Sequence, residues 1–327
     1  MYSAADERGA GRDAAEVSSV IRDRLVQPIH FAERVWNRGQ RIWADTSNAR
    51  MSAELSFRAD RDAHRVHLPT SSSDDDLLEA LRRDGIVMTT VERLGLGGVA
   101  ASAEPLVSEL LSMAVPPDLP ATHLPPDRLI TRPDIFRWGA EDRILNLLER
   151  YFEVPVAFHG VYLRRDMAVA ASGASNLWHL DMEDRHVLKV VVYLTDMQDG
   201  DGSFTYVDLE RSTELRRSLG STYRLGPDEQ MRKLVPEDAW QTVKGPAGTV
   251  LISDTALLFH KGQRPRHRDR ATLFYDYTSR RPLHPFYCKS ALPRRHLEDL
   301  TAGMGGRAKD AVFWRPRLKE FDPVRHE

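Results

Sequence analysis

The sequence predicts an α+β protein in which helices come first and a β-rich sandwich or barrel-like roll follows. Apolar residues recur at helical spacing before about residue 151. After it, apolar and β-branched runs alternate with turns rich in Gly, Pro and Asp. Helices and strands that are segregated along a chain favour an α+β fold over a parallel α/β sheet. With 327 residues, 41% of them hydrophobic, the chain is long enough to bury a large core.

Charge and cysteine content exclude several classes of protein. Lys and Arg (46) nearly balance Asp and Glu (48), so no global field directs the chain to nucleic acid or to an anionic membrane. The single cysteine, Cys288, excludes internal disulfides and multi-thiolate metal sites, which leaves imidazole and carboxylate for any metal chemistry. No apolar run is long enough to span a membrane and Met1–Ala15 is polar, so we expect a soluble, cytoplasmic protein.

The first seventy residues are expected to lie outside the main domain. Residues 1–15 lack apolar periodicity and predict a disordered tail. Apolar residues at helical spacing from Ala15 to about Asp45, interrupted at Pro28, predict two helices, so residues 16–70 would form an N-terminal helical extension. Their apolar stripe would pack on the body of the protein; a dimer or partner surface is the alternative, and a homo-oligomer stays open.

The main domain is expected over residues 71–290, with a C-terminal extension over 291–327. The proline-rich stretch between Pro105 and Pro133 predicts irregular chain, either a packed surface loop or a lid over a site. The expected regular elements are helices over 74–84, 106–113 and 141–151, and strands over 85–91, 154–163, 187–195, 203–207, 249–258 and 272–278.

His179 and Asp181 are the first candidates for a metal site. They lie two residues apart in the run Trp178–Asp181, so on a strand both side chains point to the same face. That spacing suits two of the three ligands of a facial metal triad. A second His-x-Asp pair, His267 and Asp269, shows that the spacing alone is not specific. Two ordinary polar side chains at a strand end are the alternative.

The chain that follows favours the metal interpretation for the first pair. Residues 187–194 form a continuous apolar run, as in a strand buried on both faces, and a second apolar strand within 249–258 leads to His260. If the two strands are neighbours, His260 completes a set of two imidazoles and one carboxylate, which suits non-haem iron(II) acting on oxygen. His159 and His186 have no carboxylate two residues away, so we treat them as ordinary polar residues.

Arg270 and Lys189 are candidates for binding an anion. Arg270 comes ten residues after His260 and immediately precedes an apolar strand, so its guanidinium enters the core. There it needs an anion, such as the far carboxylate of a keto-acid that chelates the metal. The alternative pairs it with Asp276 or another internal acid. Lys189 is a lone charge in an apolar strand and could contact the keto-acid or an acidic substrate, or extend to the sheet edge.

Other candidates carry weaker signals. Arg164 and Arg165 follow a predicted strand and could orient a substrate, although a surface pair is an equal alternative. Trp178 is expected to pack, and could also form a wall of the pocket. The basic run from Arg264 to Arg270 has no aromatic ladder or recognition helix, so no nucleic-acid partner is expected; a solvated loop, or a site for an anionic group of the substrate, fits better.

Together these segments resemble the phytanoyl-CoA dioxygenase (PhyH)-like family, which belongs to the Fe(II)/2-oxoglutarate-dependent oxygenases. The likeness spans about Asp75 to Arg281 and is loose between about 95 and 155. The residues that carry it are Trp178–Asp181, Leu194–Asp196, Asp199–Gly202, Gly248–Thr249, His260 and Arg270, with Leu78–Val87 upstream.

The resemblance implies a double-stranded β-helix, the jelly-roll or cupin-like fold. It implies Fe(II) bound by His179, Asp181 and His260, 2-oxoglutarate held by Arg270, and O2 as co-substrate. The implied activity is hydroxylation, or another oxidation, of an unactivated C–H bond in a small-molecule metabolite of secondary metabolism, with release of succinate and CO2.

One departure leaves the substrate open. Family members often carry a Pro-Gly-Ser-His segment after the turn at Asp199–Gly202, whereas Tyr206–Arg211 stands in its place here. Nothing in the residues points to coenzyme A thioesters. Two alternatives from other classes also stay open. A cupin-like metal-dependent isomerase or dioxygenase without 2-oxoglutarate would not require Arg270, and a non-catalytic ligand-binding β-roll would not require Asp181.

Overall fold

The structure is a computed structural model that describes residues 35–44, 46–69, 72–116, 119–168, 173–220, 224–315 and 319–320. The expected tail over 1–15 and the expected helix before Pro28 lie outside these residues. The chain divides into two units, Met1–Ala53 and Glu54–Glu327. The first unit is helical over 35–44 and contains the start of α2 (Ser47–Arg65). The domain limits predicted at residues 70 and 290 stay predictions.

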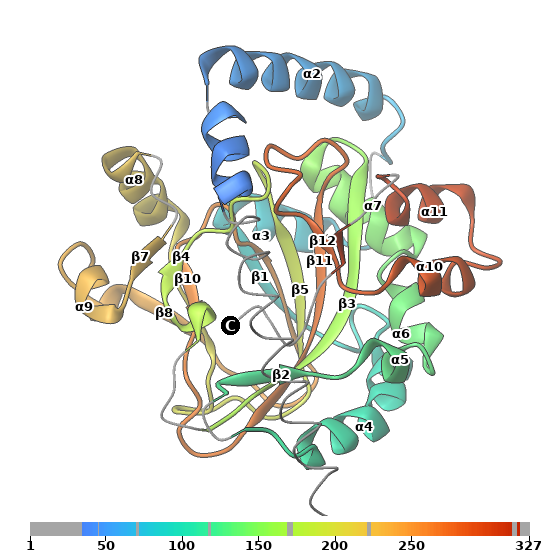
Figure 1. Cartoon of the computed structure of the whole chain (residues 1–327), viewed down its shortest axis with the longest axis vertical. Coiled ribbons are helices and arrows are strands. Elements are labelled where there is room, and N and C mark those ends of the chain that lie inside the picture. The colour runs from blue at the N-terminus through green and yellow to red at the C-terminus, as the bar shows by residue number, and fades with distance from the viewer. Residues whose placement is uncertain are drawn as a thin grey trace, which may run out of the picture. The chain divides into compact units, whose positions relative to one another are not determined.

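Two antiparallel sheets form the centre of the second unit (Figure 1). Helices cover their outer faces, and no helix of the described part of the chain is both long and apolar enough to cross a membrane. The larger sheet has the order β1 (Ile86–Thr90), β9 (Thr249–Asp254), β5 (Leu188–Tyr193), β11 (Arg270–Ser279), β3 (Val156–Asp166) and β2 (Ala121–His123). The smaller sheet has the order β7 (Arg224–Gly226), β4 (Trp178–His179), β10 (His260–Gly262), β6 (Phe204–Val207) and β8 (Trp240–Val243).

The chain alternates between these sheets as a jelly-roll requires. Strands β3, β5, β9 and β11 belong to the larger sheet, and β4, β6, β8 and β10, which come between or beside them along the chain, belong to the smaller one. The later crossings add strands next to ones much earlier in the chain, such as β11 between β5 and β3. The predicted double-stranded β-helix is confirmed by this topology.

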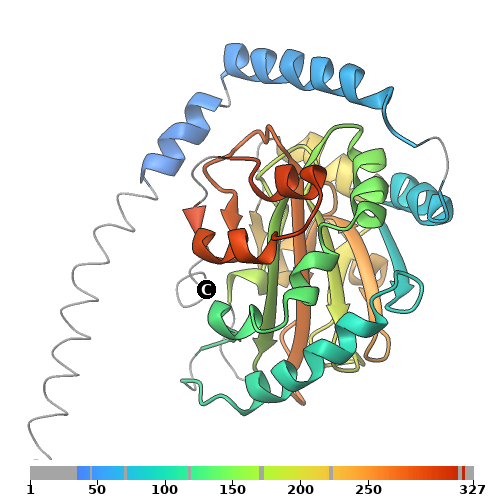
Figure 2. The ribbon, with the colours of Figure 1, turned by 90° about the vertical axis from the view of Figure 1, so that its right-hand side faces the viewer.

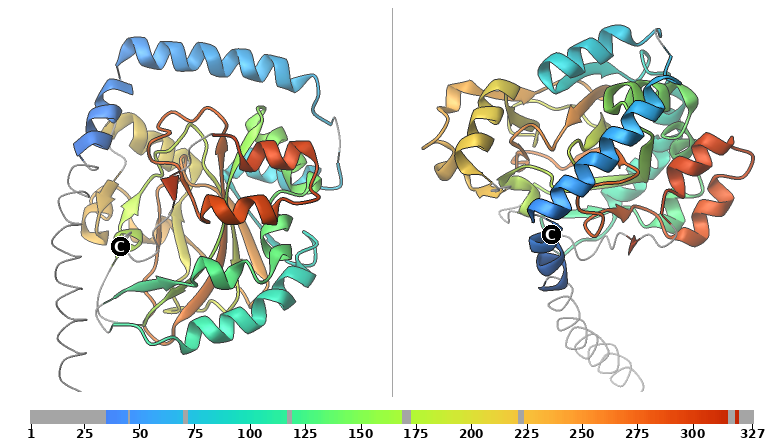
Figure 3. Two further views of the ribbon diagram at one scale, coloured as in Figure 1. Left: turned by 45° about the vertical axis from the view of Figure 1, so that its right-hand side comes forward. Right: turned by 90° about the horizontal axis from the view of Figure 1, so that it is seen from above.

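Helices pack on the outer face of each sheet. Helices cover the larger sheet (Figure 2). Their apolar side chains join one cluster with the outward residues of β3, β5, β9 and β11. These helices are α3 (Asp75–Asp84), α4 (Gly97–Ser112), α5 (Pro126–Leu129), α6 (Pro133–Trp138), α7 (Asp142–Phe152), α10 (Arg294–Leu300) and α11 (Gly306–Val312). Helices α8 (Leu209–Leu219) and α9 (Asp228–Met231) lie at the smaller sheet, on the opposite side of the β-roll from α10 and α11 (Figure 3). Short elements complete the list: the 3-10 turns Ala174–Asn176 and Glu237–Ala239, and the parallel pair β12 (Lys289–Ser290) and β13 (Lys319–Glu320).

Side-chain alternation places charged groups between the sheets. On β5, Leu188, Val190 and Val192 pack under the helices, whereas Val191 and Tyr193 face the smaller sheet. Since side chains alternate along a strand, Lys189 shares the inner face with Val191 and Tyr193. The same alternation on β11 turns Tyr275 and Tyr277 outward and Asp276 inward.

A β-bulge in β3 resets the direction of its side chains. Tyr275 of β11 pairs with Val161, and Tyr277 pairs with Phe158, so two residues of β3, His159 and Gly160, lie opposite Asp276 alone. Gly160 has φ of 100°, a value that favours glycine. Because of this extra residue, both His159 before the bulge and Tyr162 after it face the interior.

The structure differs from the sequence-based expectation in several segments. Within 105–133 the described residues are more regular than expected: α4 runs through Pro105, and β2 and α5 follow it. Pro105 lies in the interior of that helix and Leu106 and Leu110 are buried, so packing outweighs the proline penalty. The strand expected over 249–258 ends at Asp254, and a turn separates it from β10. Apolar residues in that turn are buried, so hydrophobicity alone does not indicate where the strand ends.

Candidate metal centre

His179, Asp181 and His260 converge at one end of the smaller sheet. His179 ends β4 and His260 begins β10, and the two strands are neighbours with these residues as direct partners. Asp181 follows His179 by two residues, and its backbone N–H donates to the carbonyl of Thr255 at 3.0 Å. Two segments separated by about eighty residues of chain are thus joined by the sheet that carries the site.

The ligand atoms of the three side chains are close enough to share one ion. One nitrogen or oxygen from each residue lies within 4.8 Å of the others. The imidazole rings of His179 and His260 have centroids 4.3 Å apart, and Nε2 of His179 lies 3.6 Å from Oδ1 of Asp181. Two imidazoles and one carboxylate in this arrangement form a facial set that suits a first-row divalent metal.

Backbone carbonyls hold both imidazoles in the tautomer that a metal needs. Nδ1 of His179 donates to the carbonyl of Leu177 at 2.7 Å, and Nδ1 of His260 donates to that of Leu258 at 3.0 Å. Nε2 of each neutral ring then carries a lone pair, because a neutral imidazole has one N–H. A hydrogen bond from the other ring nitrogen is the usual support of a metal-binding histidine.

The charges around the three residues also fit a cation. Burial, together with the neighbouring His179, lowers the pKa of His260 to about 3, against the opposing effect of Asp181, so the ring is neutral at pH 7. Burial alone would raise the pKa of Asp181, but Lys189 and the two histidines outweigh it and hold the pKa below its usual range. An ionised carboxylate beside two neutral imidazoles is the protonation state that metal binding requires.

Lys189 compensates Asp181 from the neighbouring sheet. Its Nζ lies 2.8 Å from Oδ2 of Asp181, and this oxygen is buried without a hydrogen-bond donor of suitable geometry among the described residues. Burial opposes the charge of Lys189, yet the carboxylates of Asp181 and Asp276 raise its pKa well above the usual value. The ammonium therefore supplies positive charge at Oδ2, while Oδ1 is the oxygen that lies 3.6 Å from Nε2 of His179.

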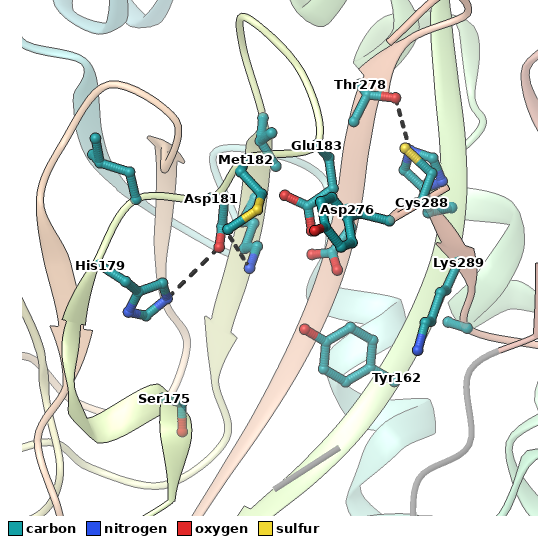
Figure 4. A pocket seen from close by; sticks show the side chains of 16 residues that line it. Tyr162, Ser175, His179, Asp181, Met182, Glu183, Asp276, Thr278, Cys288 and Lys289 are labelled. Carbon is teal, nitrogen blue, oxygen red and sulfur yellow. Dashed lines mark hydrogen bonds and ion pairs between the residues drawn. The ribbon is translucent and has the colours of Figure 1, made fainter. Parts of the chain in front are cut away.

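A cavity of about 490 Å³ opens beside His179 and Asp181 (Figure 4). Its volume lies within the range of small-molecule sites, about 300–1,000 Å³. It is lined by His159, Tyr162, Ser175, His179, Leu180, Asp181, Met182, Glu183, Val187, Lys189, Asp276, Thr278, Tyr287, Cys288, Lys289 and Ala291. The cavity thus joins the candidate metal ligands to polar side chains of β3 and β11.

Two further carboxylates in the cavity have raised pKa values. Burial, with the Asp181 carboxylate adding to it, raises the pKa of Glu183 to about 7, although Lys189 opposes the shift. Burial raises the pKa of Asp276 to about 6, and Asp181 adds to this, while Lys189 and a hydrogen bond from Tyr162 oppose it. In Figure 4 the side chains of Glu183 and Asp276 lie close together, across the cavity from His179.

Arg270 does not line this cavity. Its Nε donates to Oδ2 of Asp166 at 2.8 Å, its Nη1 donates to the carbonyl of Gly202, and its side chain is 7% exposed. The sequence analysis gave an internal acid as the alternative partner of Arg270. The structure shows such a pair, and the acid is Asp166 rather than Asp276. Asp166 also accepts two hydrogen bonds from Arg164, so one carboxylate lies between two guanidiniums.

The other candidates lie outside the cavity. Arg165 donates to Asp269, to the backbone carbonyl of Leu110 in α4 and to that of Met113, which follows α4. Asp269, the aspartate of the second His-x-Asp pair, is therefore the partner of an arginine. Trp178 is fully buried, and its indole N–H donates to Asp228 at 2.9 Å, so it packs behind the site. His186 hydrogen-bonds Asp254 at 2.6 Å.

Sequence reasoning missed Glu183 and treated Asp276 and His159 only as alternatives. Glu183 lies two residues after Asp181, so the spacing that singled out His179 and Asp181 applied to it as well. The inward direction of His159, Tyr162 and Asp276 depends on the bulge at Gly160, for which an isolated glycine within a predicted strand was the available signal.

Comparisons with known proteins give distant structural likenesses. No protein-family model matches the chain, and no curated protein matches it. HygX from Streptomyces hygroscopicus, with nickel and 2-oxoglutarate bound, is 20% identical over 64% of this chain and 88% of its own, with a TM-score of 0.43. EctD from S. alaskensis, with 2-oxoglutarate and 5-hydroxyectoine, is 15% identical over 81% of this chain and 92% of its own, with a TM-score of 0.44. SnoN, a non-heme alpha-ketoglutarate-dependent epimerase from nogalamycin biosynthesis, is 16% identical over 64% and 85%, with a TM-score of 0.41. These likenesses are too distant to carry an argument about the function of this chain.

Proposed function

We propose that the chain is an iron(II)- and 2-oxoglutarate-dependent oxygenase that oxidises an unactivated C–H bond of a small-molecule metabolite. The observation that carries the proposal is the convergence of His179, Asp181 and His260, with one ligand atom of each within 4.8 Å of the others. The double-stranded β-helix and the adjoining cavity are consistent with it. Such a ligand set leaves coordination positions open for a chelating co-substrate and for oxygen.

The residues present fit the metal. Both imidazoles have Nδ1 bound to a backbone carbonyl, and the buried carboxylate of Asp181 has Oδ1 3.6 Å from Nε2 of His179. With iron(II) bound there, 2-oxoglutarate and O2 would supply the oxidation, in which one oxygen atom enters succinate as CO2 leaves and the other enters the substrate.

Lys189 and Arg270 are the residues that would bind 2-oxoglutarate. Lys189 lines the cavity and compensates Asp181; a bound dication would take over that compensation, so its ammonium could pair with a carboxylate of the co-substrate. Arg270 lies outside the cavity, with Nε and Nη1 on Asp166 and Gly202, so Nη2 would have to reach the far carboxylate from there. The protein's part is then to orient both molecules and to keep water from the reacting atoms.

The test is 2-oxoglutarate turnover by the full chain. With iron(II), 2-oxoglutarate and O2, we expect the wild-type protein to form succinate, and His260→Ala to lose at least 100-fold of this rate, about 2.7 kcal/mol. His267→Ala, which changes the exposed histidine of the second His-x-Asp pair, serves as the matched control and keeps the wild-type rate. Equal rates in wild type and His260→Ala would overturn the proposal.

A second candidate is a metal-dependent β-roll enzyme that does not use 2-oxoglutarate. The contacts of Arg270 favour it, since Asp166 already pairs with the guanidinium that the co-substrate would need. Oxygen consumption with a metabolite mixture separates the two. Consumption that requires 2-oxoglutarate supports the oxygenase, and consumption that is independent of it supports the alternative.

A further inference from the structure

Apart from Oδ2 of Asp181, which lies 2.8 Å from Lys189, three buried acceptor atoms in the cavity have no hydrogen-bond partner among the described residues. They are Oε2 of Glu183, Oδ1 of Asp276 and Nδ1 of His159. All three residues line the same cavity beside the candidate metal ligands. Buried polar groups are nearly always hydrogen-bonded, so three such acceptors at one cavity indicate a ligand that brings the donors.

The protonation of His159 follows from its neighbours. The hydroxyl of Thr278 donates its only proton to the carbonyl of Ser279 at 2.9 Å, so it accepts the hydrogen bond that links it to Nε2 of His159 at 2.8 Å. Nε2 therefore carries the ring proton. Burial lowers the pKa of His159 to about 4, so the ring stays neutral at pH 7. His159 is 7% exposed, and its Nδ1 is an acceptor that only a donor within the cavity can satisfy.

Glu183 and Asp276 share the charge of Lys189 with Asp181, and this charge lowers the pKa of both without outweighing their burial. Neither carboxylate takes part in an ion pair, and the ammonium of Lys189 lies against Asp181. Asp276 has a hydrogen bond from Tyr162, which satisfies one oxygen without adding positive charge. Three buried carboxylates, Asp181, Glu183 and Asp276, that share the charge of Lys189 are costly to keep ionised. A ligand that carries a positive charge offsets this cost, whereas an anionic ligand would increase it.

We propose that the substrate is a small polar molecule with a protonated amine, which donates to Asp276 and Glu183 while a hydroxyl or a further N–H of the molecule donates to Nδ1 of His159. This inference rests on the proposed function for its reaction and names the substrate class for the same cavity. The volume of about 490 Å³ and the hydroxyls of Tyr162, Ser175 and Thr278 suit a hydroxylated amine rather than a long acyl chain. The amine fixes the orientation of the molecule, and the metal position determines which C–H bond is oxidised.

The experiment measures charge preference in the metal-free full chain. The probes are D-glucosamine, 3-amino-1,2-propanediol and trans-4-aminocyclohexanol, each compared with its N-acetyl derivative and with the corresponding alcohol. Ligand-observed NMR at pH 7.5 and low salt gives the relative affinities. We expect each amine to bind wild-type protein at least fivefold more tightly than both neutral counterparts. No preference for the amines in the wild-type protein overturns the proposal.

Substitutions of cavity residues test whether the preference for amines arises from binding in the cavity. Asp276→Asn and Glu183→Gln keep the shape of the side chain and remove its charge, and each is expected to lower the preference for amines at least threefold. Glu104→Gln, an exposed change on α4, is the matched control and keeps the preference. A melting curve shows that each variant is folded. A preference that persists in both cavity variants overturns the proposal.

Failure of this inference is distinguishable from failure of the proposed function. The preference for amines is measured without iron or 2-oxoglutarate, so His260→Ala should retain it while losing succinate formation. Succinate formation by a wild-type protein that shows no preference for amines would overturn the substrate class and leave the oxygenase in place.

Discussion

The candidate metal ligands were accessible to sequence reasoning because their signal is local. His179 and Asp181 are two residues apart, and His260 ends an apolar run, so strand geometry alone brings each to a sheet end. The partner of Arg270 was not accessible in this way. Asp166 is 104 residues earlier in the chain, and the two meet only because β11 pairs with β3 in one particular register.

The shared carboxylate of Asp166 provides a test of Arg270. Arg270→Leu and Arg164→Leu each remove one of the two guanidinium partners of Asp166. Both variants therefore lose the same type of buried ion pair. If Arg270 also binds the far carboxylate of 2-oxoglutarate, only Arg270→Leu raises the dissociation constant for 2-oxoglutarate, by about tenfold or more, since a charged hydrogen bond contributes about 1.5–3 kcal/mol. Equilibrium binding to the metal-loaded protein measures it. An equal change in both variants would assign Arg270 a structural role only.

Strands and helices were predictable where their periodicity was long. The helix before Gly85 and the strands that became β3, β5 and β11 have clear patterns of buried residues. In the smaller sheet, β6 was predicted within 203–207, whereas β4 and β10 were missed because they have only two and three residues. Such short strands are stabilised by packing against neighbouring strands and α8, and the local sequence pattern does not indicate this packing.

The bulge at Gly160 predicts a specific sensitivity of β3. A side chain at φ of 100° is strained, and a Cβ there would lie 3.3 Å from Cβ of Ala291. We expect Gly160→Ala to lower the free energy of unfolding by about 1–2 kcal/mol. Gly98→Ala in α4 is the control, because its Cβ would meet nothing within 4 Å; it should leave stability unchanged or raise it by about 0.4–1 kcal/mol. Urea unfolding measures both. Equal stability of the two variants would show that the bulge does not depend on glycine.

A buried pair at the end of β9 predicts a pH dependence of stability. Burial opposes protonation of His186, but its hydrogen bond to Asp254 and the charges of Asp254 and Asp184 outweigh both burial and the repulsion from Arg216, so its pKa is raised. A group whose pKa is raised by folding stabilises the protein below its unfolded pKa, about 6.5, and this contribution disappears as the pH rises through the folded pKa.

The difference between wild type and His186→Gln isolates this contribution. Melting temperatures of both proteins are compared at pH 6 and pH 8.5. We expect the wild-type protein to exceed the variant by more at pH 6 than at pH 8.5. A gap that is constant, or that widens at the higher pH, would contradict the pairing with Asp254.

At the level of the whole molecule, the jelly-roll brings distant segments to one cavity. Its walls come from the larger sheet, with His159, Lys189 and Asp276, and from the smaller sheet, with His179. The fold class was predictable from helices followed by short strands. The content of the cavity was not, because it depends on which faces of the two sheets oppose one another.

The most direct test of the central claim is the binding of iron(II) to the full chain under anaerobic conditions, measured by competition with a chromophoric chelator. The account predicts one equivalent of iron(II) for the wild-type protein, a loss of at least 100-fold in affinity for Asp181→Ala, and wild-type binding for Asp238→Ala, an exposed aspartate in the turn before β8. Wild-type affinity in Asp181→Ala, or no stoichiometric binding by the wild-type protein, would contradict it.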